Sequence, residues 1–197
     1  IKVSRANLGN KPHANFNWST ECYRPDQPVM FSNQSETDIG ILDKFNWQIQ
    51  LADSTITYDS ENISYTFPET GDYKVNFIVE TNYGCSDSIA FVFSLKPTVS
   101  IADNPYYEDF ETGKNGWIKT ANFQGEVNSW KFGFSESDFP GLISGAYCWY
   151  TDIITGEEEQ SWIVSPCFDF SNSIKPMIKF NAWRSFDLIS DGAVMQY

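Results

Sequence analysis

The sequence predicts an all-β protein built as two successive β-sandwich domains. Three observations lead to this prediction: no stretch of three turns has apolar residues at helical spacing, apolar and polar residues alternate with a period of two in many segments, and turn-forming residues separate these segments. The chain has 197 residues, of which 41% are hydrophobic and 17% aromatic. That length and composition are sufficient for two ordinary domains with apolar cores.

The clearest alternation in the chain lies in its first half. Phe45, Trp47 and Ile49 fall on one face of an extended segment while polar residues fall on the other, as in a strand with one side in a core. Further strands of the same kind are expected at Ala14–Trp18, Val29–Phe31, Ile63–Phe67, Tyr73–Val79 and Ile89–Phe93. Turn residues between them give the spacing of a sandwich.

Prolines suggest where the first domain ends. The segment LKPTVSIADNP carries prolines at 97 and 105, and proline cannot donate to a central strand ladder, so we expect a connector there. The expected organisation is a linker or the end of a preceding domain at 1–11, a sandwich at 12–95, a connector at 96–104 and part of a second domain at 105–197. The closing DGAVMQY alternates like a strand that has been interrupted.

Four cysteines allow three disulfide pairings. The expected boundary places Cys22 and Cys85 in the first domain and Cys148 and Cys167 in the second, so pairing within each domain is the simplest solution. Disulfides would indicate an extracytoplasmic, secreted or cell-surface setting. The alternative is four buried free thiols in a cytosolic protein.

Charge and motifs exclude several classes of function. A net charge of −13 disfavours nucleic-acid partners and anionic membrane surfaces, and no apolar run approaches the roughly 18 to 20 residues that span a bilayer. The only histidine is His13, and the chain has no Walker A motif, GxSxG motif or dinucleotide fingerprint. We therefore expect no enzyme within these residues, and neither nucleic-acid binding nor membrane insertion.

Residues 12–95 resemble a PKD domain, an immunoglobulin-like β-sandwich. The resemblance lies in PHANFNWSTECYRPDQPVMFSNQS, in FNWQI and above all in ISYTFPETGDYKVNFIVETNYGCSDS. The FNWQI segment lacks the acidic glycine-rich turn that many relatives place directly after the tryptophan strand. A calcium site is therefore not expected at that turn.

Residues 107–197 resemble the opening of jelly-roll, MAM-like domains in large exported proteins of gliding Bacteroidetes. The resemblance lies in YEDFETGKNGW, NSWKFG, EQSWIVSPCFDFS and SDGAVMQY. It implies that the chain holds only part of this domain, and that the parent protein is exported by the type IX route and displayed at, or released from, the cell surface. The outer-membrane secretion machinery is then an expected partner.

The same resemblance implies two kinds of site. Jelly-roll relatives often hold calcium through oxygen ligands near their termini, which makes calcium the one cofactor expected here. Its candidate ligands are Glu108, Asp109, Glu111, Asp187 and Asp191; turn capping and ordinary solvation are the alternative roles for them. Short Asp-Ser patterns make Ser54 and Ser88 candidate O-glycosylation sites.

The aromatic residues of the second domain are expected either to form a ligand-binding site or to pack in its core. Trp130, Trp149 and Tyr150 are candidates for a sugar-stacking platform, because flat aromatic faces are how many β-sandwiches hold carbohydrate. Core packing is the alternative, and it is also expected for Trp162 and Trp183. The acidic run at 157–159 is expected to be solvated.

These observations lead to a non-catalytic spacer and interaction segment of a secreted or cell-surface multidomain protein, adhesin-like in character, whose partner is a protein or glycan. The alternative is an accessory or carbohydrate-binding region of a secreted peptidase or polysaccharide-degrading enzyme. Neither hypothesis requires a catalytic residue within the chain.

Overall fold

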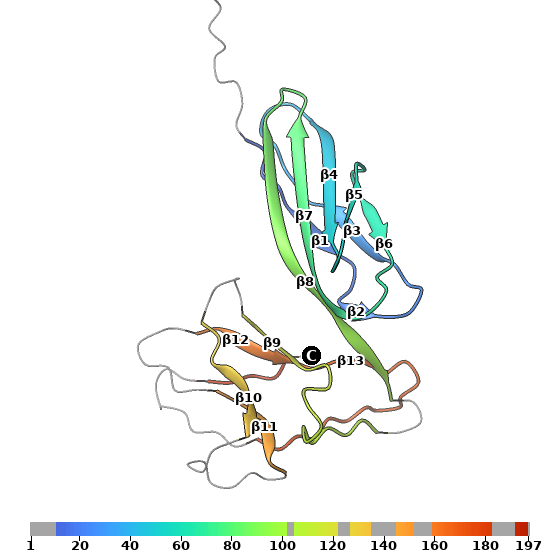
Figure 1. The fold of residues 1–197 in the computed structure, drawn as a ribbon, viewed down its shortest axis with the longest axis vertical. Coiled ribbons are helices and arrows are strands. Elements are labelled where there is room, and N and C mark those ends of the chain that lie inside the picture. The colour runs from blue at the N-terminus through green and yellow to red at the C-terminus, as the bar shows by residue number, and fades with distance from the viewer. Residues whose placement is uncertain are drawn as a thin grey trace, which may run out of the picture. The chain divides into compact units, whose positions relative to one another are not determined.

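The structure is a computed structural model that describes residues 11–101, 105–121, 127–134, 145–151, 159–182 and 192–196 (Figure 1). Every regular element in this described part is a β-strand, which confirms the all-β prediction. The chain divides into two compact units. Unit 1 is Ile1–Val99 together with Pro166–Phe168, and unit 2 is Ser100–Ser165 together with Asp169–Tyr197.

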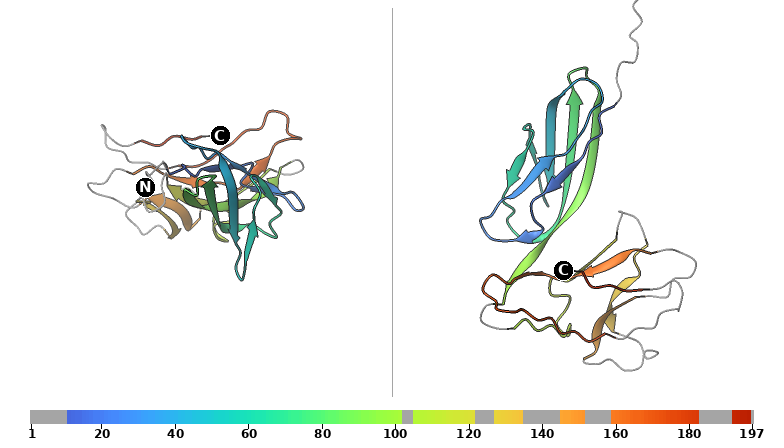
Figure 2. Two further views of the ribbon diagram at one scale, coloured as in Figure 1. Left: turned by 90° about the horizontal axis from the view of Figure 1, so that it is seen from above. Right: turned by 180° about the vertical axis from the view of Figure 1, so that it is seen from behind.

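Unit 1 is a sandwich of a small and a large sheet (Figures 1 and 2). The small sheet has the order β1-β3-β6, with β1 at Phe16–Trp18, β3 at Val29–Asn33 and β6 at Ile63–Tyr65. The large sheet has the order β13-β8-β7-β4-β5, and β2 pairs with β8 in addition. Its strands are β2 Cys22–Tyr23, β4 Leu42–Gln50, β5 Thr55–Tyr58, β7 Gly71–Thr81, β8 Ser86–Ser100 and β13 Cys167–Asp169.

The core of unit 1 is formed by the apolar face of each predicted strand. On β4, Trp47 and Ile49 are fully buried, and Trp47 lies opposite Phe77 of β7. The Trp47 and Phe77 rings stack with their centroids 3.7 Å apart. The indole Nε1 of Trp47 donates to the Ser60 carbonyl at 2.9 Å, so the one polar atom of this ring is also satisfied. Period-two alternation therefore identified the core-facing residues of both strands correctly.

Asp87 anchors the segment of unit 1 that precedes β1. Its carboxylate accepts from the Ala14 backbone N–H at 2.8 Å and lies 2.5 Å from the Lys11 ammonium. Burial alone would raise the pKa of Asp87, but these donors outweigh it and hold the pKa below its usual value. Next to Ala14, His13 forms a backbone bridge with Glu36. Asp87 therefore holds the segment directly before β1 against the start of β8.

Strand β8 continues into the stretch that the sequence analysis assigned to a connector. It runs through Pro97 to Ser100, so residues 96–100 are strand. The proline is tolerated because it lies beyond the pairing with β7: the antiparallel strand β7 begins at Gly71, opposite Leu95. Beyond that point β8 is paired instead by β2, in parallel, with Cys22 opposite Lys96 and Tyr23 opposite Pro97.

Unit 2 contains two antiparallel strand pairs in its described part. In the first, β9 at Ile118–Ala121 pairs with β12 at Ser161–Val164. In the second, β10 at Trp130–Phe134 pairs with β11 at Tyr147–Thr151. The alternation of side chains along β10 and β11 places aromatic residues on one face of this second pair, and that face is described below.

Candidate functional site

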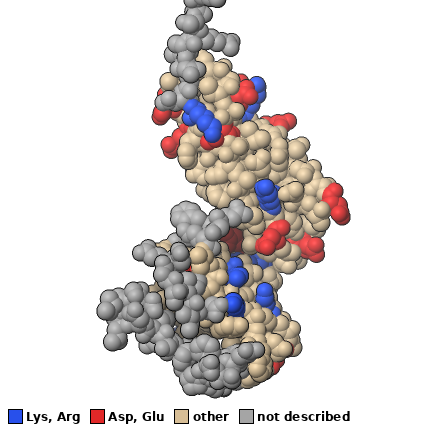
Figure 3. All heavy atoms as spheres, turned by 60° about the vertical axis from the view of Figure 1, so that its left-hand side comes forward, with Lys and Arg blue, Asp and Glu red and all other residues tan. Residues whose placement is uncertain are grey.

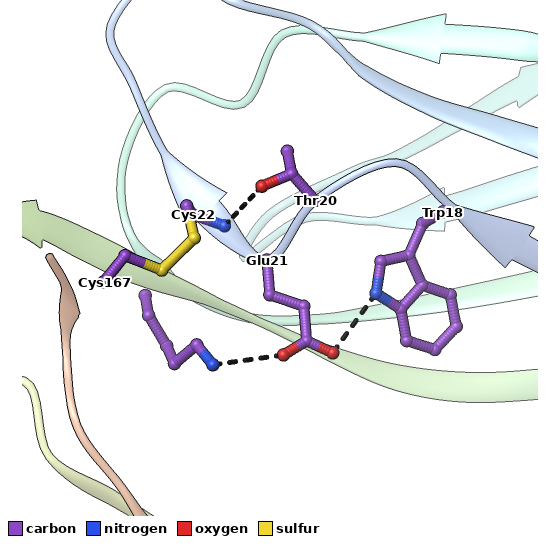
Figure 4. Close-up of a disulfide and its surroundings, with 6 residues drawn as sticks. Trp18, Thr20, Glu21, Cys22 and Cys167 are labelled. Atoms are coloured by element: carbon purple, nitrogen blue, oxygen red, sulfur yellow. Dashed lines mark hydrogen bonds and ion pairs between the residues drawn. A yellow bond between two sulfur atoms is a disulfide. The ribbon is translucent and has the colours of Figure 1, made fainter. Parts of the chain in front are cut away.

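The disulfide of the structure joins Cys22 to Cys167, and both residues belong to unit 1 (Figure 4). Cys22 lies in β2 and Cys167 in β13, with their Cα atoms 5.7 Å apart. Both strands pair with β8, which brings the two cysteines together although 145 positions separate them in the sequence. The bond therefore closes a covalent loop that contains most of the chain.

Glu21, next to Cys22, stabilises the position of the disulfide on β8. The backbone carbonyl of Glu21 accepts from the Lys96 N–H at 2.7 Å, and its carboxylate lies 3.2 Å from the Lys96 ammonium. The same carboxylate accepts from Nε1 of Trp18 at 3.2 Å (Figure 4). Together these bonds hold the short strand β2 against β8, in the position that the disulfide requires.

The expected pairing of cysteines within each domain is wrong. Cys85 and Cys148 are free thiols in the structure. Cys85 directly precedes β8, whereas Cys22 lies opposite Lys96, roughly 35 Å farther along that strand at its ordinary rise per residue. A disulfide needs Cα atoms within about 7 Å, so Cys22 and Cys85 cannot meet. Cys148 lies in β11 opposite Gly133, and burial raises the pKa of its thiol.

The described calcium candidates serve as hydrogen-bond acceptors within unit 2. Glu108 accepts from the Phe110 N–H at 2.7 Å and from the Asn115 amide at 3.0 Å, while Asp109 accepts from the Glu111 N–H at 3.1 Å. Glu111 accepts from the backbone N–H groups of Ala146, directly before β11, and of Tyr147, its first residue, at 2.6 and 2.9 Å. Asp187 and Asp191 lie outside the described residues. Among the residues that are described, no three His, Cys, Asp or Glu side chains form a group that could hold a metal.

An aromatic face covers one side of the β10–β11 pair. We define it as Trp130, Phe132, Phe134, Tyr147 and Trp149, because the register places Phe132 opposite Trp149 and Phe134 opposite Tyr147. The Phe132 and Trp149 ring centroids lie 5.5 Å apart. Phe134 is 59% exposed and Tyr147 is 42% exposed, so these two rings are accessible. A stacking platform requires accessible rings, and the aromatic face offers them at these two positions.

The three aromatic residues that the sequence analysis proposed as a sugar-stacking platform do not lie on the same side of the β10–β11 pair. Trp130 and Trp149 belong to the aromatic face, but Tyr150 lies opposite Lys131 on the other side of the strand pair. The indole Nε1 of Trp149 is buried, and the Lys114 ammonium lies 5.5 Å from the centre of its ring. Sequence reasoning missed Phe134 and Tyr147, although the alternation in WKFGF and YCWYT places both on the face of Trp149.

Glu159 links two strands of unit 2. Its carboxylate accepts from the N–H and the hydroxyl of Ser129, at 2.7 and 3.0 Å, and also from the Ser161 hydroxyl. Burial alone would raise the pKa of Glu159, but these donors and the nearby Lys119 charge lower it on balance. The acidic run was expected to be solvated, and this expectation fails at Glu159 because Ser129, directly before β10, and Ser161, the first residue of β12, both donate to it.

We predict that replacing Glu159 with glutamine reduces the stability of unit 2 by about 1–3 kcal/mol at neutral pH, since hydrogen bonds to a charged group are lost. A carboxyl group whose pKa is lowered by folding contributes stability above its usual pKa, and this contribution disappears as pH falls through the folded value. Urea unfolding of Glu159→Gln between pH 7 and pH 3 should therefore depend less on pH than that of the parent. Asp53→Asn, in an exposed turn, serves as the control, and an equal pH dependence of Glu159→Gln and the parent would contradict the role given to Glu159.

The candidate glycosylation sites are both sterically accessible. Ser54 lies in the exposed turn between β4 and β5, and Ser88 is exposed on β8. Asp87, the first residue of the second pattern, is occupied in holding Ala14 and Lys11. O-glycosylation at either serine stays a prediction.

The described surface carries charges of both signs. On the face shown in Figure 3, the described acidic and basic side chains are scattered among uncharged residues, and neither sign forms a continuous patch there. Among the described residues, no helix is long and apolar enough to cross a membrane.

Several solved structures resemble parts of the chain. The PKD1 domain of Vibrio anguillarum Epp shares 20% sequence identity, covers 44% of this chain and 95% of its own length, and gives a TM-score of 0.39. The PKD1 domain of the Vibrio cholerae metalloprotease PrtV shares 20% identity, covers 44% of this chain and 98% of its own length, and gives 0.38. A chain from a study of promiscuous carbohydrate-binding modules of the β-sandwich superfamily shares 21% identity, covers 72% of this chain and 53% of its own length, and gives 0.40.

None of the curated proteins compared with this chain matches the chain. The comparison with protein families finds a match within unit 1. The MAM-like character of residues 107–197 stays a prediction. Residues 10–93 match the family described as PKD domain, and this stretch contains the small sheet and all of the large sheet except β13 and the part of β8 after Phe93.

Proposed function

We propose that the chain is a non-catalytic spacer and interaction segment of a secreted or cell-surface multidomain protein. The observation that carries this proposal is the PKD match over residues 10–93, which form most of the unit 1 sandwich. Disulfides persist in oxidising, extracytoplasmic compartments, so the Cys22–Cys167 bond supports the same location.

The side chains that could have served catalysis support a structural role instead. Glu108, Glu111 and Glu159 each accept backbone N–H groups, and these bonds fix turns and strand ends of unit 2. The sequence contains a single histidine, so no histidine-centred triad can form within the chain. Both observations favour a segment that acts as a spacer or binds a partner, rather than one that catalyses a reaction.

The finer form of the proposal is an adhesin-like segment displayed by type IX secretion, with the outer-membrane secretion machinery as a transient partner and gliding motility as the setting. The resemblance of residues 107–197 to exported proteins of gliding Bacteroidetes supports it. An antibody against the chain should label intact source cells and detect a polypeptide heavier than 22.5 kDa. Labelling only after lysis would contradict surface display.

A second candidate function is glycan binding by unit 2, whether in an adhesin or in the accessory region of a secreted peptidase or polysaccharide-degrading enzyme. The aromatic face supports it, because Phe134 and Tyr147 present accessible rings on the same side of the β10–β11 pair. Sugar rings stack on such surfaces through their apolar faces.

We predict that Phe134→Ala combined with Tyr147→Ala weakens binding to a polysaccharide ligand about 5- to 150-fold. Each ring contributes about 0.5–1.5 kcal/mol of stacking beyond its buried area, and a tenfold change in affinity corresponds to about 1.4 kcal/mol. Affinity electrophoresis against soluble β-glucan, xylan and mannan measures the effect. Tyr150→Ala removes a ring from the opposite face and is the matched control. Retention of the parent by none of these polysaccharides, or equal loss in both variants, would contradict a glycan site on the aromatic face.

A further inference from the structure

The route of the chain through unit 1 is unusual. Residues up to Val99 build most of the unit, the chain then enters unit 2, and it returns to add Pro166–Phe168. The returning segment supplies β13, whose Cys167 bonds to Cys22 near the start of unit 1. The covalent loop closed in this way contains β3 to β8 and every strand from β9 to β12.

The two ends of this loop are attached to the same strand. β13 pairs with β8, and β2 pairs with β8 in parallel, with Cys22 opposite Lys96. The Lys96 side chain is 13% exposed where it meets Glu21, whose own side chain is 45% exposed, so this ion pair is shielded from water on the lysine side only. The disulfide therefore joins two segments that noncovalent bonds already hold in place on β8.

We propose that the Cys22–Cys167 disulfide is a mechanical bypass for tension applied between the two ends of the chain. Such tension passes along the backbone to Cys22, crosses the disulfide to Cys167 and leaves along the residues that follow. The chain between the two cysteines carries no load while the bond is intact. This inference deepens the spacer role proposed above and rests on it for its biological setting.

The bypass protects most of the unit 1 core. The buried residues of β4 and β7, including Trp47 and Phe77, lie inside the covalent loop. Ala14 and Phe16, in and before β1, lie outside it on the loaded segment. The hydrogen bond between Ala14 and Asp87 and the backbone bridge between His13 and Glu36 resist the peeling of this segment. Within unit 1, tension is therefore expected to remove at most β1 and the residues of β13 that follow Cys167, and to leave β4, β5, β7 and β8 in place.

Single-molecule force spectroscopy of the whole chain, held at its two ends, tests the proposal. Under oxidising conditions, only residues before Cys22 and after Cys167 should extend. Dithiothreitol then donates two electrons and two protons, the disulfide becomes two thiols, and the reductant closes into its own cyclic disulfide. Because the cysteines are 145 positions apart, reduction should release about 500 Å of additional contour length, at roughly 3.3–3.6 Å per residue.

Two variants complete the test. Cys22→Ser with Cys167→Ser should give the long extension without reductant, and Cys85→Ser with Cys148→Ser should keep the short one. Should the first variant fail to fold, reduction of the parent during pulling still gives the measurement. Full extension of the oxidised parent would overturn the proposal, and so would an increment near 210 Å, which corresponds to a Cys22–Cys85 bond. None of these results depends on surface display or glycan binding, so failure of the bypass is distinguishable from failure of the proposed function.

Discussion

Replacing Trp47 with alanine is expected to lower the free energy of unfolding of unit 1 by about 3–5 kcal/mol, the usual cost of removing a large aromatic side chain from a core. Trp47 is fully buried, stacks on Phe77 at 3.7 Å and meets the Phe16 ring edge-on at 5.1 Å. The substitution also removes the donor to the Ser60 carbonyl. The substitution would leave a cavity between the two sheets, because Phe16 belongs to the small sheet and Phe77 to the large one.

Hydrogen exchange of peptides from β4 and β7 measures this loss in unit 1 specifically, since protection reports local opening free energy. Val92→Ala is the control, because Val92 is 47% exposed on β8 and its truncation should change stability by no more than about 0.5 kcal/mol. If Trp47→Ala reduced protection no more than Val92→Ala does, the core described for unit 1 would be wrong.

Removing the disulfide is expected to be about as damaging. In the chain-entropy description, a bond that closes a loop of 145 residues stabilises the folded chain by about 5 kcal/mol, because the unfolded chain loses conformational freedom. Cys22→Ser with Cys167→Ser should therefore lower the urea midpoint strongly. The hydrogen bonds of Glu21 to Lys96 and Trp18 remain, so the fold of unit 1 should persist at low denaturant.

The matched control is Cys85→Ser with Cys148→Ser, which removes the same number of sulfur atoms but no covalent bond. Its midpoint should stay close to that of the parent, and adding reductant to the parent should reproduce the loss seen in the first variant. A larger loss in the control than in the Cys22 and Cys167 variant would contradict the assigned pairing.

Local patterns in the sequence were enough to predict the sandwich of unit 1. Alternation identified Trp47, Ile49, Val75 and Phe77 as core residues because a half-buried strand imposes a period of two. Pro97 was misinterpreted, since its effect depends on where the neighbouring antiparallel strand β7 begins, which is not a local property. The expectation of a connector from residue 96 failed for that reason.

The sites were less predictable than the fold. Cysteine pairing depended on a returning segment, and no local pattern in the sequence shows that Cys167 belongs with unit 1. Glu159 belongs to an acidic run that suggests solvation, yet two of its donors come from Ser129, thirty positions away. By contrast, the separation of Tyr150 from Trp149 follows from strand alternation alone and was available from the sequence.

Disulfide mapping of the native chain tests the central claim most directly. Free thiols are alkylated first, and the unreduced chain is digested with trypsin and then with a glutamate-specific protease, which cuts in the acidic run at 157–159 between Cys148 and Cys167. Mass spectrometry should find the Cys22 peptide linked to the Cys167 peptide, with Cys85 and Cys148 alkylated. A Cys22–Cys85 or Cys148–Cys167 linkage would contradict both the closure of unit 1 and the mechanical bypass.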